Sequence, residues 1–196
     1  MESEDALQSL PDDTAPPLEC TPDDPTDGGQ SPPAAQVHPT LTPPPHGRAA
    51  VRAFYGDIHI VELGPKKWAI QPVDWEGGNL VLVRDFPWIG RKLYVHKDIV
   101  EPTRALLAVC EKYGYAIDQI GAFNVRPKRV NGDPSVHCWA AALDINSARN
   151  PQVAPGAPMV TDMPMAMVEE IEALGWTWGG RFGHPDPMHF QWCSGY

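Results

Sequence analysis

Residues 135–146 read Ser-Val-His-Cys-Trp-Ala-Ala-Ala-Leu-Asp-Ile-Asn, and this segment is the most informative in the chain. Its second part, residues 140–145, is a run of small and apolar residues with the length of a strand. Alternation along that strand places Asp144 on one face and Leu143 and Ile145 on the other. A buried carboxylate is costly unless it meets a cation or several hydrogen-bond donors. Asp144 is therefore either a solvent-facing acid on an edge strand or a ligand, and the segment alone favours the first.

Two further segments carry polar residues in a regular pattern. Residues 175–182 read Gly-Trp-Thr-Trp-Gly-Gly-Arg-Phe, and residues 186–192 read Asp-Pro-Met-His-Phe-Gln-Trp. In a strand that follows Met188, His189 and Gln191 face the same way. A carboxylate three residues before a histidine can place an acid and an imidazole around one point. A lone histidine beside aromatic residues, however, is usually a structural hydrogen-bonding residue.

Taken together, these segments predict a metal site. His137, Asp144 and His189 supply two nitrogens and one oxygen. Three protein ligands leave one tetrahedral position open for water, which distinguishes a catalytic zinc site from a structural one. Asp186 is then the spare carboxylate that such a site needs as a general base. We therefore expect one Zn²⁺ per chain.

The order of these motifs resembles a known family. Ser-x-His followed by Ala-x-Asp, then Trp-Gly-Gly, then Asp-x-Met-His-Phe is similar to the pattern of the zinc metallopeptidases that act on peptidoglycan stem peptides. These include VanY-type D-alanyl-D-alanine carboxypeptidases and L-alanyl-D-glutamate endopeptidases such as phage endolysins. The resemblance covers roughly residues 54–196. It implies the small α+β fold of D,D-peptidases and hedgehog domains, with a mixed or antiparallel sheet and flanking helices.

The resemblance also implies roles for individual residues. Arg126 matches an arginine near the substrate carbonyl or carboxylate, and Ser135 matches a serine that helps to hold substrate. Asp186 matches the catalytic base. The zinc ligands correspond to His137, Asp144 and His189.

Ala140 departs from the family pattern, which usually has glycine at this position. A Cβ would crowd the turn if the backbone requires positive φ, and it would be tolerated in ordinary β geometry. The candidate ligands and the base are intact, so this difference does not argue against activity.

These features imply a zinc-dependent peptidase that cleaves peptidoglycan stem peptides. Aspartate rather than glutamate at position 186 resembles the endopeptidase branch, which favours cleavage between L-Ala and D-Glu. One alternative is a carboxypeptidase that removes terminal D-Ala. Another is a non-catalytic zinc-stabilised domain used for binding or in a virion, although such a domain has no use for a spare base.

Acidic residues and prolines are concentrated at the start of the chain. The chain has 196 residues and a formal charge of −10, and residues 1–47 contain nine acidic and no basic residues. Residues 1–46 hold eleven of the 23 prolines and no aromatic residue. Such a segment cannot bury enough apolar surface to offset its ordering entropy. We predict an acidic, Pro-rich disordered arm over residues 1–47 and one zinc peptidase domain over residues 48–196.

Composition also excludes several classes of partner. An acidic arm and the absence of a basic patch argue against nucleic-acid binding. No apolar run approaches the roughly 18–20 residues that span a membrane. The first residues lack the pattern of a signal peptide, so we expect a monomer made in the cytoplasm that acts on the cell wall. A phage enzyme released by a holin or carried in a virion fits this expectation, and the cysteines are then free thiols.

The remaining pattern predicts a mixed α+β order. Helices are expected over residues 98–113, ended by Gly114, and from residue 161 or 162 to about 174. Short strands are expected over residues 51–61, 80–83, 92–96, 116–125, 140–145, 176–178 and 189–192.

Overall fold

The computed structural model describes residues 41–84, 86, 92–128 and 131–196. Within these residues the α-helices are α1 (Arg48–Tyr55), α2 (Trp75–Asn79), α3 (Val100–Lys112) and α4 (Met165–Ala173). The 3-10 helices are η2 (Lys97–Ile99), η3 (Val136–Trp139) and η4 (Gly179–Arg181). The strands are β1 (His59–Gly64), β2 (Lys67–Gln71), β3 (Leu80–Val83), β4 (Leu93–His96), β5 (Ile120–Gly121), β6 (Ala142–Ile145), β7 (Thr177–Trp178) and β8 (His189–Gln191).

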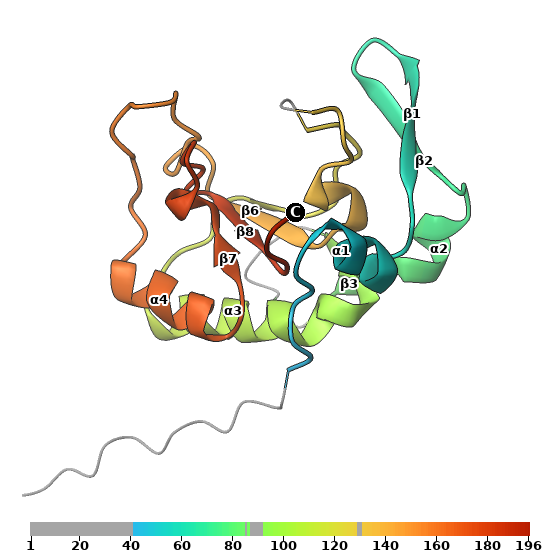
Figure 1. Ribbon diagram of the computed structural model, residues 1–196. Helices are drawn as coiled ribbons and strands as arrows, with labels where there is room; N and C mark the ends of the chain where they lie inside the picture. Colours follow the sequence, from blue (N-terminus) through green and yellow to red (C-terminus); the bar gives the residue numbers. More distant parts are fainter. Residues whose placement is uncertain (1–40, 85, 87–91, 129–130) are drawn as a thin grey trace, which may run out of the picture. The chain divides into compact units, whose positions relative to one another are not determined.

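The strands form three small antiparallel sheets. Strand β1 pairs with β2, β3 pairs with β4, and a four-stranded sheet has the order β5-β6-β8-β7. Helices α3 and α4 lie side by side below the four-stranded sheet in Figure 1, and the hairpin of β1 and β2 projects at the upper right. This arrangement confirms the predicted α+β class, with small antiparallel sheets and flanking helices.

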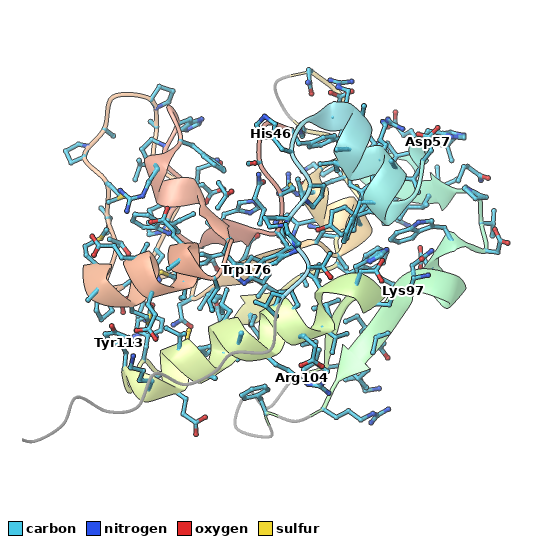
Figure 2. All side chains as sticks on the ribbon, turned by 60° about the horizontal axis from the view of Figure 1, so that its bottom comes forward. His46, Asp57, Lys97, Arg104, Tyr113 and Trp176 are labelled. Carbon is cyan, nitrogen blue, oxygen red and sulfur yellow. The ribbon has the colours of Figure 1, made fainter. Side chains whose placement is uncertain are left out.

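The core lies between α3 and the four-stranded sheet. Leu106 and Cys110 are buried on one side of α3 at helical spacing, as the sequence predicts. Figure 2 shows Trp176 over this helix, and its indole N–H donates to the Pro102 carbonyl at 3.3 Å. Burial of a large apolar side chain stabilises a fold by about 1.5–3 kcal/mol. The largest contributors are the fully buried Trp139, Trp178, Trp192, Tyr55 and Phe190.

Two predicted strands differ from the structure. Residues 51–55 belong to helix α1, because Val51 and Tyr55 are buried one turn apart and Gly56 ends the helix at φ 104. Only Ile120–Gly121 is a strand within residues 116–125. Before this strand, the backbone N–H groups of residues 118 and 119 donate to Asn146 Oδ1 at 2.8 and 3.0 Å. These side-chain hydrogen bonds take the place of backbone pairing with a neighbouring strand.

The start of the described chain pairs with its end. The backbone N–H of Gly47 donates to Ser194 O at 2.8 Å, and the N–H of Ser194 donates to Pro45 O at 3.1 Å. The His46 ring, labelled in Figure 2 beside α1, lies 2.9 Å from Ser194 Oγ through Nδ1. Residues 1–40 of the predicted arm lie outside the described residues, so the arm and its boundary at residue 47 stay predictions. None of the described helices has the length and apolar character needed to cross a membrane.

Candidate metal centre and its cleft

Two adjacent strands and one 3-10 helix bring the three candidate ligands together. Asp144 of β6 lies opposite His189 of β8 in the antiparallel register. Directly opposed residues present their side chains on the same face, and His189 Nδ1 lies 3.0 Å from Asp144 Oδ1. Helix η3 adds His137, whose Nε2 lies 3.1 Å from Asp144 Oδ1 and 3.2 Å from His189 Nδ1. The three atoms form one compact triangle.

The size of this triangle suits a zinc ion. Tetrahedral ligands at about 2.0–2.1 Å from zinc lie about 3.3 Å from one another. The measured separations of 3.0, 3.1 and 3.2 Å are close to that value. Two imidazole nitrogens and one carboxylate oxygen are ordinary zinc donors, and they leave a coordination position for water or substrate. The residues therefore fit the predicted metal.

A backbone carbonyl fixes the tautomer of His137. Its Nδ1 lies 2.7 Å from the carbonyl oxygen of Ala122, immediately after β5. A carbonyl oxygen only accepts, so Nδ1 carries the proton and Nε2 presents a lone pair to the triangle.

A side-chain amide fixes the tautomer of His189 in the same way. Gln191 donates its Nε2–H to the Cys193 carbonyl at 3.2 Å, which turns Oε1 towards the ring. His189 Nε2 lies 3.1 Å from this Oε1 and donates to it, so that Nδ1 is left with a lone pair. Two imidazole lone pairs and a carboxylate oxygen thus converge, an arrangement that a cation stabilises.

The electrostatics of the cluster also favour positive charge at its centre. Burial opposes ionisation of Asp144, but the close contacts with the His137 and His189 rings outweigh burial and hold the pKa of the carboxyl well below its ordinary value. Burial would lower the pKa of His189, yet its contact with Asp144 raises it. Both shifts have the sign expected of a cation-binding site.

Helix η3 positions His137 through both of its ends. Ser135 caps the helix, since its Oγ accepts the His137 N–H at 3.4 Å. Ala140 ends it in the left-handed region, with φ 49 and ψ 32. The backbone thus requires positive φ where the family usually has glycine. This conformation costs an alanine roughly 1–2 kcal/mol, and burial of its methyl group offsets part of the cost.

Asp186 lies in the turn before β8 and lines the same cleft as Asp144 and His189. Its Oδ2 accepts from Gln152 Nε2 at 3.3 Å. Its Oδ1 is buried and has no hydrogen-bond partner among the described residues. Burial raises the pKa of Asp186, and the negative charge of Asp144 adds to this while His189 opposes it. An unpartnered carboxylate oxygen with a raised pKa suits proton transfer.

The Trp-Gly-Gly motif explains where Asp186 lies. The backbone N–H of Asp186 donates to Gly179 O at 2.9 Å. A Cβ on Gly179 would lie 2.5 Å from Asp186 O and 3.0 Å from His189 Cβ. Glycine is required here because the Asp186 turn packs directly on this backbone.

The cleft that contains these residues has a volume of about 1020 Å³. Arg126 and Ser135 also line it, and the Ser135 N–H donates to Arg126 O at 3.0 Å. Thus the two residues predicted to contact substrate are neighbours beside the candidate metal centre. The Cys138 thiol donates to Arg126 O at 3.2 Å. Cys110, Cys138 and Cys193 are free thiols.

Some supporting residues escape prediction from the sequence. The Ala122 carbonyl is a backbone group, so no residue type in the sequence indicates its role. Gln191 could be found from the sequence, because it shares a strand face with His189. His184 is exposed at the cleft, whereas His96 ends β4 and is buried against Tyr55.

Comparison with known proteins agrees with this geometry. Residues 129–192 match the family described as D-alanyl-D-alanine carboxypeptidase, which consists of zinc metallopeptidases. The match contains His137, Asp144, His189 and Asp186 and confirms the resemblance inferred from the motifs. The match is confined to residues 129–192 and supports, at the level of the family, a zinc peptidase that acts on peptidoglycan. No curated protein and no solved structure matches the chain.

Proposed function

We propose that this protein is a zinc-dependent endopeptidase that hydrolyses the L-Ala–D-Glu bond of peptidoglycan stem peptides at the cell wall. The observation that carries the proposal is the triangle of His137 Nε2, Asp144 Oδ1 and His189 Nδ1 in one cleft with Asp186. Aspartate at the position of the base resembles the endopeptidase branch of the family.

The chain's own residues account for the proton movements of hydrolysis. Zinc bound by the three ligands would supply Lewis-acid activation of water and of the scissile carbonyl. Asp186 takes a proton from the attacking water as the water oxygen bonds to the carbonyl carbon. Asp186 then returns the proton to the leaving amine as the C–N bond breaks. Arg126 offsets the negative charge that develops on the carbonyl oxygen, and Ser135 holds substrate.

A second candidate is a carboxypeptidase that removes the terminal D-Ala. The description of the matching family favours it. The same ligands and base serve both reactions, because both hydrolyse an amide bond. The two activities differ in which part of the stem peptide enters the cleft.

Digestion of purified peptidoglycan by the zinc-loaded protein separates these functions. An endopeptidase releases stem peptides that begin with D-Glu, whereas a carboxypeptidase releases free D-Ala and leaves the glycan linkage intact. Mass spectrometry of the products distinguishes the two. Absence of any product, with zinc bound and the fold intact, would contradict both activities and favour a zinc-stabilised binding domain.

A further inference from the structure

The wall of the cleft carries residues that the proposed reaction does not use. Lys66 and Trp68, from the turn and second strand of the β1–β2 hairpin, line it together with Lys128 and Tyr196. All four lie outside residues 129–192, the segment that matches the peptidase family. They bring two amines and two aromatic rings to the cleft that holds the candidate metal centre.

Lys128 is a half-buried cation. Its Nζ lies 3.5 Å from the centroid of the Tyr196 ring, and the Tyr196 hydroxyl donates to Pro134 O at 3.0 Å. Among the residues that the structure describes, Lys128 forms no ion pair. Burial lowers the pKa of Lys128, although Asp133 opposes this effect. The contact with the ring stabilises the ammonium only in part, so an anion in the cleft would improve its environment.

The backbone holds Lys128 close to the reaction centre. Its N–H donates to Asp133 O at 2.6 Å, in the same ribbon in which Ser135 pairs with Arg126. Arg48 of helix α1 donates to the Asp133 carboxylate at 2.8 Å and anchors the ribbon. Lys128 therefore lies two residues from a predicted substrate-binding residue, on a segment secured at both ends.

Lys66 and Lys67 provide a comparison within one hairpin. Both are exposed, but Lys66 lines the cleft and Lys67 does not. Lys66 adopts φ 58 in the turn, which changes the direction of the chain between the two lysines. Trp68 is half-buried, pairs with Glu62 across the hairpin and lines the cleft with Lys66.

Cations elsewhere on the domain are commonly paired. Ion pairs join Arg52 to Asp57, Lys112 to Glu170, Arg149 to Asp162 and Arg181 to Glu172. By contrast, Lys66, Arg126 and Lys128 line the cleft without an ion pair to any described residue. Asp144 and Asp186 line the same cleft, but Lys66, Arg126 and Lys128 outnumber them, so the cations favour an anionic group over a neutral one of the same shape.

We infer that Lys66 and Lys128 form a subsite that binds a free carboxylate of the stem peptide, with the Trp68 and Tyr196 rings as its apolar wall. This inference rests on the proposed function and names the substrate group that the cleft recognises. In an L-Ala–D-Glu–L-Lys–D-Ala–D-Ala peptide linked through the D-Glu side chain, two carboxylates are free. One is the α-carboxylate of D-Glu, and the other is the C-terminal carboxylate.

The test compares this peptide with two analogues, one amidated at D-Glu and one amidated at the C-terminus. The full-length zinc-loaded protein, Lys66→Gln, Lys128→Gln and the matched control Lys67→Gln are assayed for KM and kcat on each. We expect Lys66→Gln and Lys128→Gln to raise KM about tenfold on the unmodified peptide with kcat little changed. Amidation of the recognised carboxylate should raise the wild-type KM similarly and abolish the further effect of the two substitutions. Lys67→Gln should behave as wild type.

The analogue on which the substitutions lose their effect identifies the carboxylate. Equal KM effects on all three peptides, or KM values within twofold of wild type, would overturn the subsite. The Lys66→Arg and Lys128→Arg variants should restore KM, which separates charge recognition from a folding defect. If the wild type cleaves none of the peptides, the proposed function fails. Peptide binding followed by NMR of the Trp68 indole N–H then tests the subsite directly, and unchanged affinity in both glutamine variants would refute it.

Discussion

The segment from Ser135 to Trp192 and the segment from Leu41 to His96 are built in different ways. The first lies within the family match and contains the candidate ligands, held by a sheet register and by hydrogen bonds that fix each imidazole. The second lies outside that match, and the residues described in it form short helices and two-stranded pairings. It is joined to the first through buried aromatic residues, such as Tyr55, whose hydroxyl donates to Trp192 O at 2.5 Å.

The first segment holds the residues proposed for hydrolysis, and the second contributes residues proposed to recognise substrate. The ligand segment tolerates few alternatives, because three donor atoms must lie within a few tenths of an ångström of their positions. The N-terminal segment needs only to cover the core and to present the β1–β2 hairpin to the cleft. We therefore expect substitutions in the first segment to abolish the reaction and substitutions in the second to change stability or substrate affinity.

The largest effect is expected from removal of two ligands. His137→Ala combined with His189→Ala should lower the metal content from about one zinc per chain to none and abolish peptidase activity. Metal analysis of the purified protein measures this change. His184→Ala is the control, since His184 is exposed in the cleft but is not part of the triangle. Stoichiometric zinc in the double variant would rule out the assigned site.

Asp186→Asn tests proton transfer without removal of a ligand. The variant keeps the size of the side chain but is a poor proton acceptor, so cleavage should slow by about 10²–10⁴-fold. Zinc content and the free energy of unfolding should stay close to wild type. Equal rates for the two proteins would place the base elsewhere, with His184 the first residue to examine.

Gly179→Ala tests the close packing beneath the Asp186 turn. The added Cβ would lie 2.5 Å from Asp186 O, so the turn must shift, and the free energy of unfolding should fall by about 1–3 kcal/mol with a loss of activity. Gly183→Ala is the matched control, because no atom lies within 4 Å of its added Cβ. Urea unfolding of both variants gives the comparison. Equal stabilities would mean that the packing is looser than described.

In the N-terminal segment, buried His96 should make stability depend on pH. Burial lowers the pKa of His96 to about 4, despite Asp98 Oδ2 at 3.5 Å from its Nδ1. The unfolded state, with a pKa near 6.5, binds more protons between these values, so this contribution is complete above pH 6.5 and lost as pH falls towards 4. At pH 5 the loss is about 2 kcal/mol.

His96→Phe should remove this dependence. Urea unfolding of the wild type and of His96→Phe at pH 7 and pH 5 measures the difference. An unchanged pH slope in the His96→Phe variant would show that the histidine is not held neutral.

The smallest effect concerns the start of the domain. Deletion of residues 1–40 should leave stability and zinc content unchanged. Deletion of residues 1–47 also removes the two backbone hydrogen bonds to Ser194 and should cost about 1–2 kcal/mol. Thermal unfolding of the two truncated proteins tests the boundary predicted at residue 47. Equal stability would support that boundary, and unfolding of the shorter deletion would extend the domain into the predicted arm.

The candidate ligands and several of the elements around them can be predicted from local patterns in the chain. His137, Asp144 and His189 stand in short motifs whose spacing is local, and strands β6 and β8 follow from the alternation of their residues. Helices α3 and α4 follow from apolar residues at helical spacing and from the glycines after them. These features depend on neighbours within about ten residues, so a single sequence contains the information.

Features that depend on partners far away in the sequence become visible only in the folded chain. Only the pairing of β6 with β8 shows that Asp144 lies opposite His189, and only the position of β5 gives His137 its carbonyl partner. Residues 51–55 are helical because a helix places Val51 and Tyr55 on one face against the core. This packing outweighs the preference of these residue types for strands. Lys66 and Trp68 of the β1–β2 hairpin line the same cleft as residues more than fifty positions away in the sequence. Long-range packing of this kind leaves no local pattern, because many sequences can cover the same surface.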